Sequence, residues 1–188
     1  MGDNVLFFYG TLMAPQVLHR VIHGSANPEP WQKAMISFHP AILHGYRRHR
    51  VKDAEYPAII PVDQTKDDLS TSSDTSPARN SVLGTLVSGL TDGDVHRLDH
   101  FEGSEYTQKK VTVHKLQTPN EVSGGGNEES LPEMLDAAQT AVADKEETPA
   151  VTYVWTAGVD ELEDAEWDFE AFKKDKLTWW AKIPETEV

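Results

Sequence analysis

The sequence predicts a strand-rich α+β protein made of a single domain. Short β-branched and aromatic runs alternate with Gly, Pro and Asp, which is the pattern of strands separated by turns. Apolar side chains recur at helical spacing in two other segments. With 188 residues and 38% hydrophobic side chains, the chain is long enough for one buried core and short for two full domains. We therefore expect residues 1–188 to form one domain.

The first strand is predicted at residues 5–10, "VLFFYG". Val5 to Phe8 form a continuous apolar run, which breaks at Tyr9, Gly10, Thr11 and Leu12. An ordinary tight turn explains this break, with Tyr9 packed on the core. Alternatively, the break is a loop that holds a ligand. The four residues alone favour the turn.

A helix is predicted directly after this break, at residues 15–24. Its apolar side chains lie at helical spacing, Pro15 stands near its start, and Gly24 stands at its end. Further β-branched or aromatic runs bounded by Gly, Pro or Asp predict five more strands, at residues 38–51, 56–62, 81–90, 109–116 and 150–155.

Two polar segments interrupt this pattern, and we expect both to be insertions within one fold. Residues 63–80 are a mixture of Ser, Thr, Asp and Pro, which is loop chemistry. Residues 117–149 contain eight acids against one base, about half of the excess behind the formal net charge of −14. Such a composition buries too little apolar surface to offset the entropy of ordering. Within the second insertion, residues 131–142 are a candidate helix.

A C-terminal helical extension is predicted at residues 160–182. Asp160 with Glu163 three positions later forms a helix N-terminal capping signal. The side chains expected to pack this helix are Leu162, Trp167, Phe169, Phe172, Trp179 and Trp180. The tryptophans are interpreted as core or docking surface rather than as a cofactor platform.

Composition also limits the partners and the cellular location that we expect for the protein. We expect no membrane partner, because no window of roughly 18 apolar residues is present, and no secretory signal, because the first apolar run follows Asp3 rather than a basic region. The absence of cysteine excludes disulfides, thiolate metal sites and cysteine nucleophiles, and agrees with a cytoplasmic location. The negative charge disfavours nucleic-acid binding. The sequence does not indicate an oligomeric state.

One further helix is predicted at residues 91–102, and it carries an acid on its apolar face. Thr91 or Asp92 can cap its start, and Gly103 is a natural end. At about 100° per residue, Val95 at 0° places Leu98 near 300° and Glu102 near 340°. Glu102 therefore lies between two apolar side chains, whereas His96, Arg97 and His100 fall away from them and Asp99 lies at the border.

Burial of the Glu102 carboxylate would raise its pKa. A Glu tuned to roughly 6–7 is suited to exchange protons with a substrate near neutral pH. The alternative is that the helix frays at Glu102 and that its side chain caps an amide or pairs with a base. From the helical projection alone, both interpretations stay open.

An ordered set of short strings then carries a family resemblance. These strings are "FFYGTL", "LHGYRR", "YPAII", "VLGTLVSGL", "RLDHFEGSEY", "VTYVW" and the closing "WDFEAF". In this order they resemble the gamma-glutamylcyclotransferase-like superfamily, and more narrowly its plant and fungal AIG2-like branch. The resemblance covers most of the chain apart from the two insertions. It implies a small mixed β-barrel flanked by helices, a cavity at one end, and neither a metal nor an organic cofactor.

The resemblance also implies the site residues. The Glu of the "LDxFEG" string is the catalytic acid and base, which here is Glu102. The "YGTL" loop offers its backbone to the glutamyl part of the substrate, and three further tyrosines stand where relatives have aromatic pocket residues. The implied binding residues are therefore Tyr9, Gly10, Thr11, Leu12, Tyr56, Tyr106 and Tyr153. Gly10 would let the backbone approach closely, and successive amides form a concavity for a carboxylate. Alternatively, the last three tyrosines are core residues with satisfied hydroxyls.

The implied reaction is the intramolecular aminolysis of a γ-glutamyl amine or dipeptide, which yields 5-oxoproline and a free amine or amino acid. The expected partner is thus a small γ-glutamyl molecule. An alternative is a non-catalytic binding or signalling module on the same fold. A metal site is less well supported. His96 and His100, like His19 and His23, are spaced i, i+4, but neither pair carries the HExxH arrangement.

One basic cluster keeps two interpretations. Residues 47–50, "RRHR", lie on a predicted strand. They could meet a substrate carboxylate or the acidic insertion, or they could form a solvated face, which is the more common role of a charge run.

Overall fold

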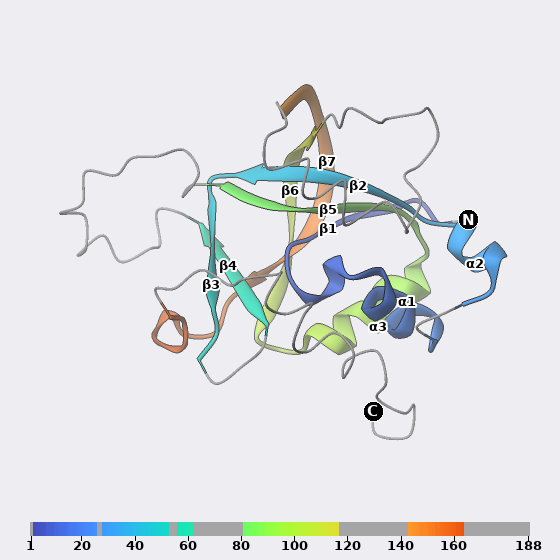
Figure 1. The fold of residues 1–188 in the computed structure, drawn as a ribbon. Coiled ribbons are helices and arrows are strands. Elements are labelled where there is room, and N and C mark those ends of the chain that lie inside the picture. Colours follow the sequence, from blue (N-terminus) through green and yellow to red (C-terminus); the bar gives the residue numbers. More distant parts are fainter. Residues whose placement is uncertain (1, 26–27, 53–55, 62–80, 117–142, 164–188) are drawn as a thin grey trace.

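A computed structural model describes residues 2–25, 28–52, 56–61, 81–116 and 143–163 (Figure 1). Within these residues the protein is α+β and rich in strands, as predicted. The strands are β1 (Asn4–Phe8), β2 (Ser37–His44), β3 (Tyr46–Arg50), β4 (Pro57–Pro61), β5 (Ser81–Leu90), β6 (Tyr106–Leu116) and β7 (Ala143–Trp155). The α-helices are α1 (Pro15–His23), α2 (Pro30–Ala34) and α3 (Asp92–Glu102), and the 3₁₀ turns are η1 (Thr11–Met13) and η6 (Val159–Glu161).

Five strands close into a barrel in the order β1-β5-β2-β6-β7. Four of the five pairings are antiparallel, and β1 closes the barrel by running parallel to β7, with Leu6 opposite Val151. The Thr152 hydroxyl donates a hydrogen bond of 2.9 Å to the Phe7 carbonyl across this closing pair. The barrel is therefore mixed, as the family resemblance implied.

Both faces of β1 are buried, which explains its continuous apolar sequence. Phe7 belongs to a cluster with residues from all five barrel strands, so it faces the barrel interior. Leu6 and Phe8 instead belong to a second cluster, together with α1 and α3. A strand covered on both sides has no exposed face and needs no polar alternation. The run from Val5 to Phe8 is thus the sequence of a strand between two packed layers.

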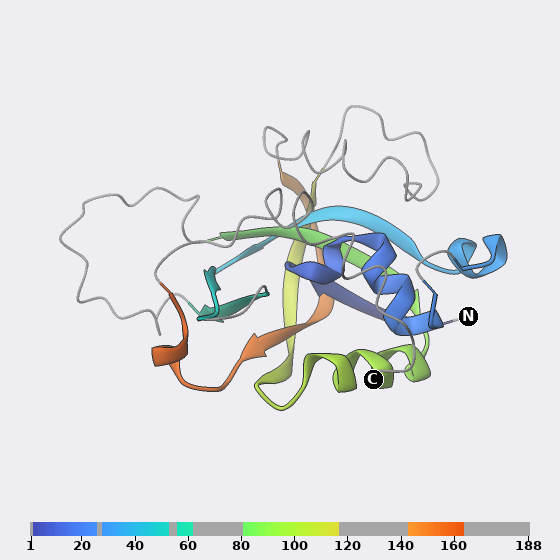
Figure 2. The same cartoon turned by 60° about the horizontal axis from the view of Figure 1, so that its bottom comes forward.

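Helices α1 and α3 pack against each other beside the barrel (Figure 2). Leu18 of α1 and Leu98 of α3 are fully buried in the layer between them and the strands. At the start of α3, the Thr91 amide donates to Asp94 Oδ2 at 3.0 Å, and the Asp94 amide donates to Thr91 Oγ1 at 3.1 Å. Of the two predicted caps, Thr91 and Asp92, the helix therefore uses Thr91. The helix ends before Gly103. No described helix has the length and apolar character needed to cross a bilayer.

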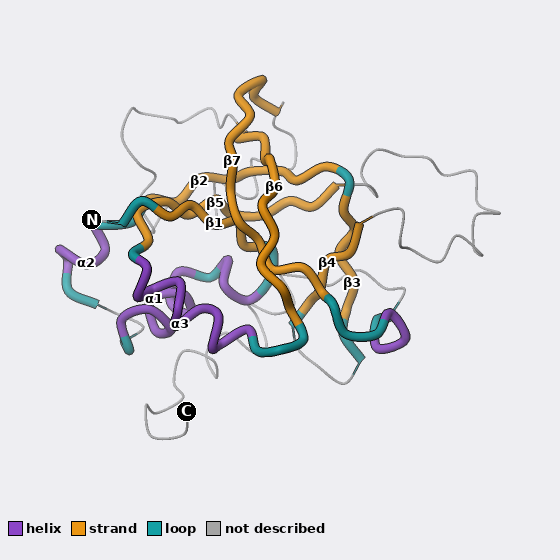
Figure 3. Tube along the Cα trace, turned by 180° about the vertical axis from the view of Figure 1, so that it is seen from behind, coloured by secondary structure: helices purple, strands orange, loops and turns teal. Residues whose placement is uncertain are grey.

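The prediction of one strand over residues 38–51 is wrong. The chain forms β2 in the barrel and then, after Gly45, β3, which pairs with β4 in a separate two-stranded sheet (Figures 1 and 3). Gly45 has a φ of 84°, a conformation that interrupts an extended strand and that residues with a Cβ rarely adopt. Because the residues on either side of Gly45 have similar strand propensity, composition alone did not reveal the break.

The β6–β7 hairpin is longer than the sequence predicted. Strand β6 starts at Tyr106 rather than at residue 109, and β7 starts at Ala143 rather than at residue 150. Pairing continues as far as Leu116 opposite Ala143, so the last residues of the expected insertion are strand. Backbone hydrogen bonds between the two strands do not require apolar side chains, which is why acidic residues can occupy β7. The candidate helix at 131–142 lies outside the described residues, as does 63–80.

The C-terminal extension does not begin as a helix capped by Asp160. That residue lies inside η6, and Leu162 forms an antiparallel bridge with Val51, just after β3. The pairing with Val51 holds the chain extended where the capping signal predicted an α-helix. The remainder of the predicted extension, at 164–182, lies outside the described residues.

We predict that Thr152→Val lowers the free energy of unfolding by about 1–2 kcal/mol, because it removes a fully buried hydrogen bond at the pairing that closes the barrel. Urea denaturation measures the change. The matched control is Thr112→Val at an exposed position of β6, which should stay within about 0.5 kcal/mol of wild type. Equal stability of the two variants would contradict a role of this hydrogen bond in closure.

Candidate active site

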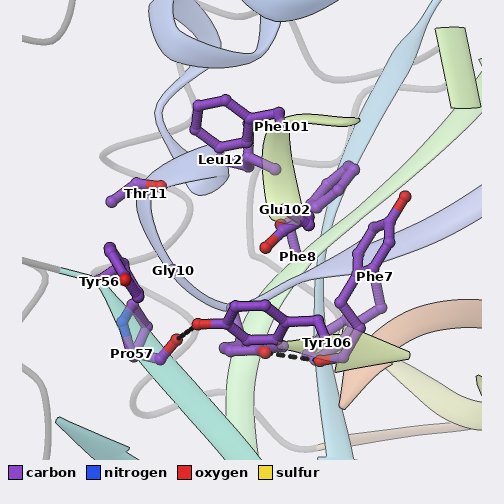
Figure 4. A pocket seen from close by; sticks show the side chains of 12 residues that line it. Phe7, Phe8, Gly10, Thr11, Leu12, Tyr56, Pro57, Phe101, Glu102 and Tyr106 are labelled. Carbon is purple, nitrogen blue, oxygen red and sulfur yellow. Dashed lines mark hydrogen bonds between the residues drawn. The ribbon is translucent and has the colours of Figure 1, made fainter. Parts of the chain in front are cut away.

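A pocket of about 140 Å³ opens at one end of the barrel (Figure 4). All eight residues that the family resemblance implied line it, namely Tyr9, Gly10, Thr11, Leu12, Tyr56, Glu102, Tyr106 and Tyr153. Four lining residues were not predicted, namely Phe7, Phe8, Pro57 and Phe101. The predicted site residues, distant in sequence, therefore share one cavity.

The strand directions explain why these residues meet. Strand β7 runs parallel to β1 and antiparallel to β6. The carboxyl ends of β1 and β7 therefore lie at the same end of the barrel as the start of β6. Tyr9 follows β1, Tyr153 lies near the end of β7, and Tyr106 begins β6. Helix α3 ends at Glu102, with three residues between it and the start of β6, so the Glu102 side chain lies at the same end of the barrel.

Glu102 is half-buried, and its side chain is directed into the space between Leu12 and Tyr106 (Figure 4). Burial among aromatic and aliphatic side chains, and secondly the negative charge of Asp99, raise the pKa of Glu102 to about 8. The expectation from the sequence was roughly 6–7, which included no contribution from Asp99. No hydrogen bond or ion pair among the described residues holds the Glu102 carboxyl group, so it does not cap an amide or pair with a base there.

Two pocket tyrosines direct their hydroxyl protons at backbone carbonyls. The Tyr9 hydroxyl donates to the Tyr153 carbonyl at 2.6 Å, and the Tyr106 hydroxyl donates to the Pro57 carbonyl at 2.8 Å (Figure 4). Burial is the first cause that raises the pKa of both hydroxyls, so both are neutral at neutral pH. The Tyr106 hydroxyl is satisfied, as the core interpretation expected, and both residues also line the pocket.

The Tyr153 hydroxyl connects the pocket to Asp99, a residue whose role the sequence did not reveal. It donates to Asp99 Oδ1 at 2.7 Å, and Gln108 Nε2 donates to the same oxygen. Burial, and secondly this hydrogen bond, raise the pKa of Tyr153. Asp99 precedes Glu102 by three residues on α3, a spacing that places two helical side chains side by side. That spacing was the sequence signal that could have identified Asp99.

Tyr56 completes an aromatic wall of the pocket. Its ring lies 6.5 Å from the Tyr106 ring between centroids, and Tyr106 in turn packs edge-on against Trp155 at 5.2 Å. Burial is the first cause that raises the pKa of Tyr56, followed by the charge of Glu105. Aromatic faces attract cations through their quadrupole. The wall can therefore contact the ammonium group of a ligand.

The loop after β1 approaches β4 closely. A Cβ atom on Gly10 would lie 2.7 Å from two ring carbons of Pro57, so a larger residue here would push the loop away from β4. The first hydrogen bond of turn η1 runs from the Met13 amide to the Gly10 carbonyl at 2.9 Å. The amides of Thr11 and Leu12 precede this bond and are not used within the turn. Such amides are suited to bind an anion.

The histidine pairs do not form a metal centre in the described part of the chain. No group of three or more histidine and acidic side chains is placed there to hold a metal ion. The rings of His19 and His23 stack at 5.6 Å, and His19 is fully buried. His96 and His100 are exposed on α3.

The basic cluster on β3 is divided between several environments. His49 is buried, Arg50 is exposed and lies 3.7 Å from Glu163, and Arg48 donates a hydrogen bond of 2.9 Å to the Tyr9 carbonyl. The cluster is therefore neither a uniformly solvated face nor a single ligand-binding group. Its residues differ because successive side chains of a strand point to opposite faces.

Residues 6–125 match the model of the family described as "Gamma-glutamyl cyclotransferase, AIG2-like". The chain belongs to this AIG2-like family. It is 25% identical to Protein AIG2 C of Arabidopsis thaliana, over 89% of this chain and 71% of that protein. It is 27% identical to Protein AIG2 B of the same plant, over 96% of this chain and 82% of that protein. These names specify no reaction.

A solution structure of an Arabidopsis thaliana protein is similar in fold to this one. The two structures align with a TM-score of 0.53 and 23% sequence identity, over 91% of this chain and 73% of that one. At this identity the similarity concerns the fold. The family match confirms the resemblance, and the closed barrel confirms the mixed α+β barrel that the resemblance implied.

In this AIG2-like protein, we predict that the Glu102 carboxyl group titrates near pH 8 and that Asp99→Asn lowers this pKa. The negative charge of Asp99 opposes ionisation of Glu102, and asparagine removes the charge but keeps an oxygen that can accept from Tyr153. Carbon-13 NMR of protein labelled at the glutamate carboxyl carbon measures the titration. Asp92→Asn, at an exposed position in the first turn of α3, is the control and should leave the pKa unchanged. A Glu102 pKa near 4.5 in the wild type would contradict the burial argument.

We also predict that Glu102→Gln stabilises the protein increasingly as pH rises. The pKa of Glu102 is about 8 in the folded protein and near 4.5 without its folded surroundings, so the folded state holds this proton more tightly. The stability contributed by the protonated carboxyl is complete below pH 4.5 and is lost as pH rises through about 8. Glutamine does not ionise and avoids this loss. The measurement is the thermal unfolding midpoint at pH 5, 7 and 9, and a constant difference between variant and wild type would refute the prediction.

Proposed function

We propose that the protein is a γ-glutamyl cyclotransferase that converts a γ-glutamyl amine or dipeptide into 5-oxoproline and a free amine or amino acid. One observation carries this proposal. Glu102 is the one carboxyl group among the described lining residues of an aromatic pocket, and its pKa is about 8. Membership of the AIG2-like gamma-glutamyl cyclotransferase family supports the same reaction class.

The pKa of Glu102 suits both proton transfers of this reaction. The α-ammonium group of the substrate has a reference pKa of about 7.7–8.0, close to that of Glu102. The Glu102 carboxylate takes a proton from the ammonium, and the freed amine attacks the γ-carbonyl carbon of the same molecule. Protonated Glu102 then gives its proton to the leaving nitrogen as the carbon–nitrogen bond breaks. The ring nitrogen loses its second proton to the Glu102 carboxylate, which passes it to the departing amine, so the products are the neutral lactam and an ammonium. One carboxyl group thus serves as base and then as acid.

The other lining residues hold the substrate. Ring faces of Tyr56 and Tyr106 and the hydroxyl lone pairs of the pocket tyrosines surround the ammonium group. Amides of the loop from Gly10 to Leu12 bind the α-carboxylate or the oxyanion of the tetrahedral intermediate. In other acyl-transfer sites one such donor contributes about 2.7–4 kcal/mol to the rate. Since nucleophile and electrophile belong to one molecule, the pocket has only to fix its conformation.

The pocket has room for only part of the substrate. A volume of about 140 Å³ is smaller than the ~300–1,000 Å³ typical of pockets for larger ligands. The glutamyl part therefore lies inside, and the leaving amine lies at the mouth, beside Phe101, which is 36% exposed. The residues at the mouth of the pocket therefore determine which leaving amine is accepted. A reaction without metal or organic cofactor and a cytoplasmic location stay predictions of the sequence.

We predict that the purified protein releases 5-oxoproline from at least one γ-glutamyl compound, and that Glu102→Gln lowers the turnover by about 10³-fold or more, because glutamine neither accepts nor returns the proton. The screen contains γ-glutamyl dipeptides, γ-glutamylamines, ε-(γ-glutamyl)lysine and glutathione, with 5-oxoproline measured by chromatography. Activity should persist in EDTA.

The matched control is Glu105→Gln, which makes the same change at an exposed residue outside the pocket and should retain wild-type turnover. Full activity of Glu102→Gln would overturn the assigned role of Glu102. Loss of activity in EDTA would instead favour a metal-dependent reaction. Binding of γ-glutamyl compounds without any product would favour the non-catalytic binding module.

A further inference from the structure

Arg48 contacts the loop after β1 without lining the pocket. It lies on β3, outside the barrel, and its Nη1 donates hydrogen bonds to the Tyr9 carbonyl at 2.9 Å and to the Leu83 carbonyl at 3.4 Å. Tyr9 and Gly10 are lining residues, whereas Arg48 is not. One guanidinium group therefore connects the back of the loop to β5 and β3.

The contact with Arg48 determines which way the next amide points. The described residues contain no cis peptide bond, and in a planar trans peptide the carbonyl and the N–H point in opposite directions. Because the Tyr9 carbonyl points at Arg48, the Gly10 N–H points away from Arg48, and Gly10 itself lines the pocket. No hydrogen bond among the described residues uses the Gly10 N–H. This amide is thus available to a ligand.

Two further contacts restrict rotation of the peptide group between Tyr9 and Gly10. The Tyr9 side chain is anchored by its hydroxyl to the Tyr153 carbonyl at 2.6 Å, and Gly10 lies against the Pro57 ring. A cation bound to the carbonyl also polarises the peptide, because charge-assisted hydrogen bonds are stronger than neutral ones and strengthen the bonds linked to them. The Gly10 N–H therefore becomes a better donor to an anion.

We propose that Arg48 is a positioning residue that aims the Gly10 N–H at the carboxylate of the ligand. The identity of the ligand rests on the proposed function, whereas the orientation of the amide does not. The product 5-oxoproline keeps the α-carboxylate of the substrate, so it is a probe of this contact that requires no turnover. Arg48 itself touches neither the substrate nor the reacting atoms.

The experiment compares Arg48→Gln and Arg48→Lys with wild type. Calorimetric titration with 5-oxoproline should show a dissociation constant about tenfold higher for Arg48→Gln, and the KM of any active substrate should rise by a similar factor while kcat changes little. Arg48→Lys should lie between the two, because lysine keeps the charge and one donor to the Tyr9 carbonyl. The matched control Arg47→Gln removes the same charge from the neighbouring strand position and should bind as wild type does.

The Gly10 amide resonance gives a second readout that a purely structural role would not move. In the ligand-free protein, Arg48→Gln should shift the Gly10 nitrogen and proton resonances, and the control should not. Addition of 5-oxoproline should move this resonance in wild type, and much less in Arg48→Gln.

Unchanged Gly10 resonances and unchanged 5-oxoproline affinity in a folded Arg48→Gln variant would overturn the proposal. Absence of 5-oxoproline binding to wild type would overturn the assignment of the ligand carboxylate. If wild type releases no 5-oxoproline from any substrate but the Gly10 resonance responds to Arg48→Gln, the proposed function fails and the positioning role of Arg48 stands.

Discussion

The burial of the Glu102 carboxyl group at the end of the barrel is the constraint on which the site depends. Removing a carboxylate from water is unfavourable, and this is why its pKa is raised to about 8. The position is maintained by packing elsewhere: α3 is capped at Thr91, held through the fully buried Leu98, and packed against α1. The closed barrel then brings the carboxyl ends of β1 and β7 and the start of β6 close to the last turn of α3. Stability supplied by the core thus keeps an ionisable group in an unfavourable environment.

Two acids on one turn of α3 have different surroundings. Asp99 accepts hydrogen bonds from Tyr153 and Gln108, whereas the Glu102 carboxyl receives none from the described residues. The nearby negative charge of Asp99 disfavours a negative charge on Glu102. The different environments of the two carboxyl groups are created by one tyrosine hydroxyl and one amide side chain, which contact Asp99 and not Glu102.

Backbone groups and rings, rather than charged side chains, dominate the rest of the pocket. The loop is held from behind by Arg48, from β7 by the Tyr9 hydroxyl bond, and from β4 by contact between Gly10 and Pro57. These contacts fix a loop that lines the cavity, and none of the described lining residues carries a cationic side chain. A buried cation would lower the pKa of Glu102. The position of Arg48 outside the lining is therefore compatible with a carboxyl group that titrates near pH 8.

Local pattern in the sequence determined the strand-rich class, the helix over 91–102 and the apolar face that includes Glu102, because periodicity and capping depend on neighbouring residues. The ordered family strings added the barrel and the loop from Tyr9 to Leu12. Tertiary structure alone decided the break at Gly45, the extension of β7 to Ala143, and the contacts of Asp99 and Arg48. Each of these depends on contacts between residues far apart in the chain, or on the solvent exclusion that such contacts create. For the same reason the carboxyl pKa reached about 8 rather than roughly 6–7, since desolvation and the charge of Asp99 act through space.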